Sequence, residues 1–434
     1  MSRVCRNVGR ASSAVLEFIN TPPERARRKH TGLMTLPTPA LRAARVSTAV
    51  GFGLQGMFLA ALLTQLPQFK DRYGFDDSTI VVAVVLVSLV AAVGSVIAEY
   101  LATRTSSKTT LRAGLFVIAC AGTGIAFAPS PAAFFTGFAV YGIGLGMVDA
   151  ATNMQAVAIQ HRYGRSILSS FHGAWSVGAI VGALYVSACS ALEVSLPVSI
   201  FGAALGVAAG TLLIGPRLLE VGPEAEATTT SAAPLAIPMR PFLALGAAMA
   251  LFFAIDFSVG NWSALYLKDL LLASASTAAL AVAAYQTAGL VSRLTGDFWV
   301  RRHGEVAVVR VGSAIAALGL VVVIVAQSPT VAIIGFLIVG LGAPVIAPLC
   351  FSAAGRLAPP DQTDAVIARL NLFNYAGTLV GGAIVGAVAA VSDLRIGFVL
   401  PLLFAMALFL LAPAFRPKRV AAGADSADLT RVVD

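Results

Sequence analysis

Four side chains that could hold a proton or a solute lie in two neighbouring apolar segments of the sequence. Asp149 and Asn153 interrupt the segment YGIGLGMVDAATNMQ. His172 and Trp175 follow the start of the next one, FHGAWSVGAIVGA. An ionisable side chain at membrane depth costs several kcal/mol, so one is rarely retained without a task. We expect Asp149 to take up and release a proton, with His172 and Asn153 tuning its proton affinity. The alternative is a buried polar pair that only holds two helices together.

A second acidic residue, Asp256, lies inside a later apolar segment. It is a candidate for a second proton site or for a substrate ligand, and the alternative is a hydrogen bond that only packs two helices. Trp262 follows near the expected outer interface. Its ring could stack on a solute, or it could anchor the helix among the lipid headgroups, as interfacial tryptophans do. We treat Asp256 as a proton-coupling candidate and Trp262 as a substrate-binding one.

Hydrogen-bonding side chains that could bind a neutral solute recur in several apolar segments. The expected substrate-binding residues are Gln55, Asn153, Trp175, Trp262, Tyr285, Gln286, Asn371 and Asn374. No arginine or lysine is expected in the middle of any apolar segment, and a transporter of organophosphates would need such a charge. The pattern therefore favours a neutral organic solute.

The composition is that of a membrane protein. The chain of 434 residues is 58% hydrophobic and 12% charged, with a mean hydropathy of +0.85. Apolar runs of about 20 residues recur, each long enough to cross a hydrocarbon core of roughly 30 Å. This predicts an all-α polytopic fold, because a β-barrel would show short alternating segments instead. No nucleophile, metal cluster or phosphate-binding loop is visible, and the four cysteines show no metal spacing. We expect no enzyme activity, no cofactor and no metal site.

The placement of the charges predicts the topology. The net charge is +9, but only Lys70, Arg72, Lys268 and Arg395 fall on what we expect to be the outer side. Cytoplasmic loops carry an excess of Lys and Arg, so both termini are expected in the cytoplasm and the protein in the plasma (inner) membrane. The basic excess then reflects topology and contact with the lipid bilayer rather than nucleic acid. We expect a monomer.

Twelve spans are predicted, with boundaries uncertain by a few residues. They fall at about 46–69, 78–101, 110–128, 132–157, 167–189, 194–215, 241–266, 273–295, 305–327, 329–353, 366–391 and 395–415. A polar tail over 1–45, rich in Arg and Pro, is expected to be disordered, and 416–434 forms a second cytoplasmic tail. The cytoplasmic linker at 216–239 separates a six-helix bundle at 46–215 from another at 240–415. This is the layout of two parallel repeats.

Internal similarity supports a duplication. A shift of 199 residues places Gly178 on Gly377 and Gly182 on Gly381, within the segments SVGAIVGA and AGTLVGGA. Small residues at this spacing are typical of helices that pack closely in membranes. We therefore interpret these glycines as packing positions in both repeats.

A resemblance to a known family rests on a loop and on scattered motifs. The loop after the eighth span reads RLTGDFWVRRHG over residues 293–304, and with the six-plus-six layout it resembles the signature loop of the major facilitator superfamily. The chain is also similar to the fucose-permease-like group through Asp149, Asn153, Gln155, Phe171-His172, Trp175-Ser176, Asp256, NWSALY at 261–266 and PLCFSAAGR at 348–356. The resemblance covers about residues 46–415, and it implies two bundles that transport by alternating access.

The signature loop is expected to form a cytoplasmic latch from Asp297, Arg301 and Arg302. A carboxylate that pairs with basic groups or with a helix terminus can close one face and separate when the repeats rock. A purely orienting role is the alternative for the two arginines.

The sequence favours a secondary transporter of a small, neutral, sugar-like solute, coupled to protons. Proton-driven efflux of drugs or metabolites is the alternative, favoured by the aliphatic content and by Gln55, where a sugar symporter of this kind would carry a carboxylate. A non-transporting sensor would need a sizeable soluble output domain, and only two tails are available. The expected partners are a small-molecule substrate, protons and the lipid bilayer.

Overall fold

The computed structural model describes residues 37–220 and 237–417, and the structural statements below concern this part of the chain. Residues 1–36 of the expected N-terminal tail lie outside the described residues, as do most of the expected linker and nearly all of the C-terminal tail. The chain divides into two compact units, Met1–Arg42 and Ala43–Asp434. The packing below is that of the second unit.

The described residues form helices and contain no strand. Before the linker these are α3 (Pro39–Thr64), α4 (Leu66–Tyr73), α5 (Asp77–Arg104), α6 (Ser107–Ala126), α7 (Pro131–Tyr163), α8 (Leu168–Ala191), α9 (Leu196–Ile214) and η1 (Gly215–Arg217). After the linker come α10 (Met239–Leu265), η2 (Tyr266–Leu270), α11 (Ala275–His303), α12 (Glu305–Val325), α13 (Pro329–Gly342), η3 (Ala343–Val345), α14 (Ile346–Gly355), η4 (Pro360–Gln362), α15 (Thr363–Val391), α16 (Leu394–Gly397), α17 (Val399–Leu411) and η5 (Ala412–Phe415).

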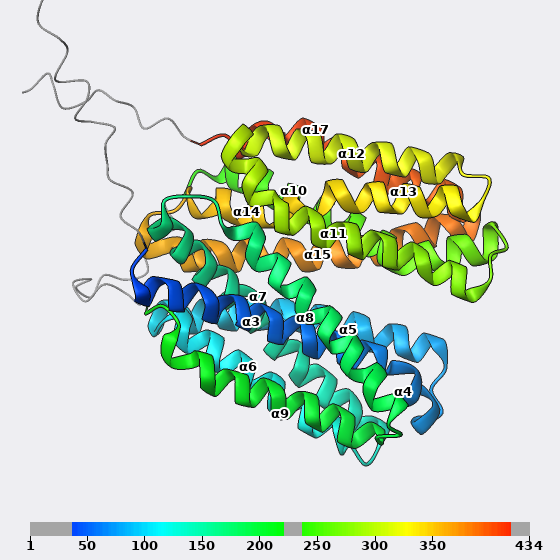
Figure 1. Ribbon diagram of the computed structural model, residues 1–434, viewed down its shortest axis with the longest axis horizontal. Helices are drawn as coiled ribbons and strands as arrows, with labels where there is room; N and C mark the ends of the chain where they lie inside the picture. Colours follow the sequence, from blue (N-terminus) through cyan, green and yellow to red (C-terminus); the bar gives the residue numbers. More distant parts are fainter. Residues whose placement is uncertain (1–36, 221–236, 418–434) are drawn as a thin grey trace, which may run out of the picture. The chain divides into compact units, whose positions relative to one another are not determined.

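These helices make two sets of six spans. Ten helical stretches of the described residues are long and apolar enough to cross a membrane. The remaining two spans are α11 and α15. In Figure 1 the helices before the linker (blue to green) group apart from those after it (yellow-green to red). We call these groups the N-terminal half, α3 to α9, and the C-terminal half, α10 to α17. The prediction of an all-α fold with two six-helix bundles is confirmed.

Two helices run further than the sequence analysis expected. The spans predicted at 132–157 and 273–295 continue as α7 to Tyr163 and α11 to His303. Each helix ends at a glycine with positive φ, Gly164 at 63° and Gly304 at 80°, a conformation that other residues adopt only with strain. Hydropathy falls where the basic residues of the last turns begin, whereas the helices stop only at the glycines.

The first span also begins earlier than expected. α3 starts at Pro39, inside the tail predicted over 1–45. Proline is well placed in a first helical turn, where its missing N–H leaves no hydrogen bond unmade. Thr38 accepts a hydrogen bond from the Leu41 amide at 3.2 Å, which caps the helix.

Glycines pack the repeats in the same way in both halves. A side chain at Gly178 of α8 would collide with the backbone of Gly53 in α3. A side chain at Gly377 of α15 would collide with the backbone of Ala250 in α10. The matching glycines therefore let equivalent helix pairs approach closely, as the sequence comparison predicted.

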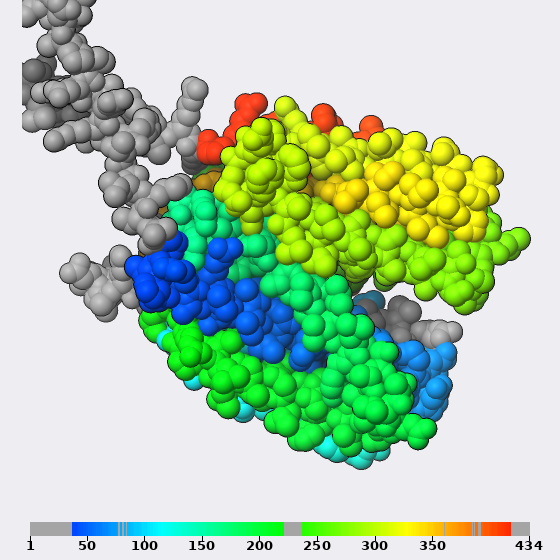
Figure 2. All heavy atoms as spheres, viewed as in Figure 1, coloured from blue at the N-terminus to red at the C-terminus, as the bar shows by residue number. Residues whose placement is uncertain are grey.

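The two halves contact each other through a symmetric pair of helix contacts. α5 lies against α15 and α8 lies against α11, while α14 touches α7 and α8. We call the end where α9 leads into the linker and α10 follows it the linker end; the turns at Gly164 and Gly304 lie there as well. The other end is the opposite end. Figure 2 shows a notch between the two halves at the opposite end.

Candidate functional site

The carboxylate of Asp149 lies at the boundary between the halves, held from both sides. Oδ1 accepts a hydrogen bond from the side-chain amide of Gln55 in α3. Oδ2 accepts one from the hydroxyl of Tyr375 in α15, at 2.6 Å. Gln55 and Tyr375 are buried, with 2% and 5% of their surface exposed, whereas Asp149 is partly exposed. The chain thus places one ionisable group where its protonation state can affect both halves.

His172 contacts the side chain of Asn153 rather than the carboxylate of Asp149. Its Nε2 lies 3.2 Å from Oδ1 of Asn153. The amide of Asn153 in turn donates to the backbone carbonyl of Asp149 at 2.8 Å. The sequence analysis expected His172 and Asn153 to tune the proton affinity of Asp149. Asn153, one turn further along α7, lies between His172 and the Asp149 backbone. The His172 ring also packs 6.1 Å from the ring of Phe351 in α14, across the boundary.

The second acidic candidate pairs within the C-terminal half. Asp256 of α10 accepts a hydrogen bond from the Tyr285 hydroxyl of α11 at 2.5 Å. The structure therefore brings together two residues that the sequence predicted separately. Gln286 is exposed on the same helix. The Trp262 indole donates to the carbonyl of Gly382 at 3.2 Å, which anchors α10 to α15.

The two predicted asparagines of α15 lie at the contact with α5. Asn371 donates to Ser95 at 3.0 Å, and Asn374 donates to Asn371 at 3.5 Å. The Ser95 hydroxyl in turn donates a hydrogen bond to the carbonyl of Gly146 in α7. Both asparagines are buried, so in this state they present little surface to a solute, and Asn371 joins the two halves.

Asp297 accepts hydrogen bonds from the first turn of α8. Its oxygens accept from the backbone amides of Ser169 at 3.0 Å and Ser170 at 2.8 Å, and from the hydroxyl of Ser166 at 3.0 Å. A carboxylate at a helix N-terminus satisfies free N–H groups and meets the positive end of the helix dipole. The predicted latch could pair Asp297 with basic groups or with a helix terminus. In the structure Asp297 pairs with the N-terminus of α8.

The two arginines of the predicted latch behave differently from each other. Arg301 donates to the carbonyl of Ser166 at 2.9 Å, which adds a second contact between the halves. Arg302 is exposed and makes no hydrogen bond or ion pair to the described residues.

Further polar contacts join the halves toward the linker end, and sequence reasoning missed them. Glu99 of α5 pairs with Arg369 of α15 at 2.7 Å. Gln160 of α7 donates to Ser352 of α14 at 2.8 Å, and Ser352 contacts Glu305. The stretch EYLATRTSSK at 99–108, after the second span, is a version of the signature loop without its glycines, and Glu99 lies in it 198 residues before Asp297. The position of Glu99 in that stretch was the only available signal.

One buried arginine was also missed, and it corrects an expectation. Arg293 has 8% of its surface exposed and lies ten residues before the end of α11, about 15 Å along the helix. Its Nη1 donates to Ser176 of α8 at 2.7 Å, and its guanidinium carbon lies 5.9 Å from the centre of the Trp175 ring. The expectation that no arginine or lysine lies in the middle of a span is therefore wrong for α11. It failed because the eighth span was ended at residue 295, where α11 in fact continues.

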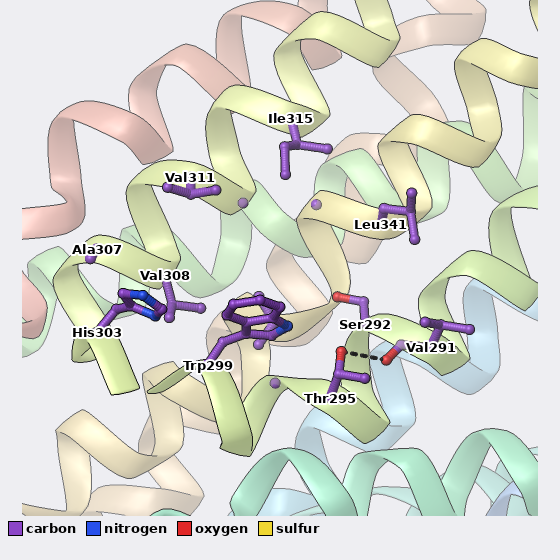
Figure 3. A pocket seen from close by; sticks show the side chains of 14 residues that line it. Val291, Ser292, Thr295, Trp299, His303, Ala307, Val308, Val311, Ile315 and Leu341 are labelled. Carbon is purple, nitrogen blue, oxygen red and sulfur yellow. Dashed lines mark hydrogen bonds between the residues drawn. The ribbon is translucent and has the colours of Figure 1, made fainter. Parts of the chain in front are cut away.

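An apolar cavity of about 640 Å³ lies elsewhere, between α11, α12 and α13 (Figure 3). Its walls carry Val311, Ile315 and Leu341, and Trp299 stacks on His303 with ring centres 5.7 Å apart. None of the predicted proton or substrate residues lines it. Its aliphatic walls would suit apolar chains and give a polar solute few partners.

Two bundles of six membrane spans, with ionisable and amide side chains at the boundary between them, are typical of secondary transporters. The sequence profile of the Major Facilitator Superfamily matches residues 11–183 and 243–431. An uncharacterized MFS-type transporter of Yersinia pestis is 32% identical over 362 residues, which are 82% of this chain and 91% of the relative. The chain therefore belongs to the major facilitator superfamily and is a multi-pass membrane transporter.

Solved structures agree on the fold. A structure of the transporter FucP in the outward conformation has a TM-score of 0.70 at 17% identity, covering 86% of this chain and 98% of that one. FucP is described in another structure as the fucose:proton symporter of E. coli. The human organic anion transporter MFSD10 has a TM-score of 0.72 at 14% identity, covering 87% of this chain and 100% of that one. The fold is fucose-permease-like, as the sequence motifs implied.

Proposed function

We propose that the protein is a proton-coupled secondary transporter that moves a small, sugar-like organic solute across the plasma membrane by alternating access. The observation that carries this proposal is the double hydrogen bonding of Asp149. Its hydrogen bond with Gln55 lies within the N-terminal half, and its hydrogen bond with Tyr375 crosses to the C-terminal half.

Protonation would weaken the two hydrogen bonds that the Asp149 carboxylate accepts. A carboxylate accepts strong, charge-assisted hydrogen bonds, and a neutral carboxyl group accepts weaker ones. Gain of a proton would therefore loosen the contact with Tyr375 and favour separation of α7 from α15. Loss of the proton would restore it. This links the charge on one side chain to the relative position of the halves, which proton coupling requires.

Alternating access would require the contacts near the linker end to break. The described contacts there include Asp297 with the start of α8, Glu99 with Arg369, and Gln160 with Ser352. The notch at the opposite end suits entry of a solute from that side. With the linker and termini in the cytoplasm, as the positive-inside pattern predicts, this arrangement is the outward-facing state.

The solute-binding residues belong to this proposal. Trp175 and Trp262 offer aromatic faces, and Gln286 is an exposed amide. The case for a neutral solute relied on the absence of an arginine inside a span, and Arg293 removes that argument. Proton-driven efflux of drugs or metabolites is the second candidate. The observation that favours it is the aromatic surface around His172, which Phe52 at 5.2 Å and Phe351 make apolar.

The proposal is tested by proton movement in proteoliposomes that contain a pH-sensitive dye. Sugars, sugar acids and lipophilic cations are added in turn, to the wild type and to Asp149→Asn. We expect a substrate-dependent pH change that is lost in Asp149→Asn and kept in Asp269→Asn, which alters an exposed aspartate. Equal responses in wild type and Asp149→Asn would rule out coupling through Asp149 and make Asp256→Asn the next variant to measure.

A further inference from the structure

Arg293 is a buried cation without an anionic partner. No carboxylate of the described residues forms an ion pair with it. Its Nε is buried and has no hydrogen-bond partner in the part of the chain that the structure describes, although a guanidinium carries five N–H donors. A buried charge is costly unless it is paired and hydrogen-bonded, so a site of this kind gains most from the arrival of an anion.

Arg293 lies at the contact between the two halves. It lies four residues from Asp297 along α11, about 6 Å toward the opposite end. Ser176 and Trp175, which it contacts, belong to α8 of the other half. The guanidinium also interacts electrostatically with Asp256, but Asp256 is hydrogen-bonded to Tyr285 and too far away for an ion pair with Arg293.

The number of cations limits the charge of the ligand. No other Arg or Lys among the described residues is buried to the same degree. A single guanidinium binds one carboxylate with two parallel hydrogen bonds, whereas a phosphate dianion would be better matched by a second cation. The Trp175 ring beside it provides a flat apolar face on which the carbon skeleton of a ligand can lie.

We propose that Arg293, with Ser176 and Trp175, binds the carboxylate of a polyhydroxylated acid, so that the solute is a sugar acid rather than a neutral sugar. This inference rests on the proposed function, because it names the substrate class of the same transporter. The hydroxyl of Ser176 accepts from Arg293 and donates to the carbonyl of His172 at 3.3 Å, so it orients the guanidinium and would reach the carboxylate only after rotating. Binding of the carboxylate would give the buried guanidinium the direct ion pair that it does not form with the described residues.

The test uses matched pairs of a neutral sugar and its acid: glucose with glucuronate, and galactose with galacturonate. Binding to the purified full-length protein is measured calorimetrically at pH 7 and constant ionic strength. We expect tighter binding of the acid in at least one pair. Arg293→Gln should weaken binding of that acid by about 10- to 100-fold, the usual range for loss of a hydrogen bond to a charged group. Binding of the neutral sugar should stay unchanged.

Two further variants distinguish a role of Arg293 in ligand binding from a purely structural role between α8 and α11. Arg293→Lys keeps the positive charge but cannot form bidentate hydrogen bonds with a carboxylate. It should therefore retain part of the preference for the acid. Arg310→Gln removes an exposed arginine of α12 and should bind both ligands as the wild type does. Elution as a single species and ligand-free thermal stability show whether each variant is folded. If the role were purely structural, Arg293→Gln would lower ligand-free stability and leave the preference for the acid intact, which would overturn the proposal.

The outcomes distinguish this inference from the proposed function. No preference for the acid in either pair, or a preference that survives in folded Arg293→Gln, overturns the inference; proton-coupled uptake of a neutral sugar would still support the transporter. Binding of the acid that depends on Arg293, without any pH change in proteoliposomes, supports the inference and contradicts proton coupling.

Discussion

The hydroxyl of Tyr375 in α15 donates a hydrogen bond to the carboxylate of Asp149 in α7, at 2.6 Å. The residues lie 226 positions apart and in different halves of the molecule. Gln55 holds the other carboxylate oxygen from the same half as Asp149. When the halves rock, the contact with Gln55 can persist, but the contact with Tyr375 has to change. The pair is therefore the part of the site most directly sensitive to conformation.

Replacing Tyr375 by Phe should weaken coupling without unfolding the protein, because it removes only the hydroxyl. We expect the substrate-driven pH change in proteoliposomes to fall by about tenfold, the effect of one hydrogen bond to a charged group. The matched control is Tyr141→Phe in α7, whose buried hydroxyl has no partner among the described residues. A loss of the same size in Tyr141→Phe would show that the effect is not specific to the Asp149 contact.

Asp297 should protect the first turn of α8 from hydrogen exchange. Asp297→Ala removes the acceptor for the amides of Ser169 and Ser170, so these amides should exchange at least about tenfold faster. Arg301→Ala loses a single contact to Ser166 and should have a smaller effect, while Arg302→Ala should have none. Exchange measured by mass spectrometry on peptides covering this turn gives the answer. Unchanged protection in Asp297→Ala would mean that the cap contributes little to closure.

The ion pair between Glu99 and Arg369 should contribute less than the Asp297 cap. Its side chains are 21% and 45% exposed, so solvent screens the attraction. Exposed pairs are typically worth about 0.2–1 kcal/mol and weaken as salt rises. Glu99→Gln should thus lower thermal stability slightly at low salt and hardly at all at high salt. The double charge swap, Glu99→Arg with Arg369→Glu, should recover the low-salt stability. A salt-independent loss would point to packing rather than charge.

The helix contacts made by glycine should tolerate no side chain. Gly178→Ala places a methyl group against the backbone of Gly53, so α3 and α8 would have to move apart to accommodate it. We expect a loss of at least about 1–3 kcal/mol, as for other overpacked cores, and a lower yield of folded protein. Gly124→Ala is the control: no atom lies near the added methyl group, and alanine favours the helix by up to about 1 kcal/mol. Equal stability of the two variants would contradict close packing at Gly178.

The sequence predicted the helices and their duplication because these depend on local apolar runs and on spacing within the chain. It also singled out Asp149, since a lone carboxylate in an apolar run is recognisable without a structure. It did not predict the partners of Asp149. Gln55 and Tyr375 lie 94 and 226 residues away, and nothing local indicates which helix faces meet. Arg293 was missed for a different reason: an arginine near the expected end of a span looks like part of a loop until the end of α11 is located at Gly304.

The spacing of Arg293 and Asp297 along α11 has a mechanical consequence. The two residues are one helical turn apart on a single rigid element, and their partners Ser176 and Ser170 lie on a second one, α8. Any rotation of one helix against the other moves both contacts together. If Arg293 binds the solute, as proposed above, solute binding and closure of the linker end depend on the same displacement of α11 against α8. The movement that opens the linker end would then also break the contact between Arg293 and the solute, so release of the solute would need no second conformational change.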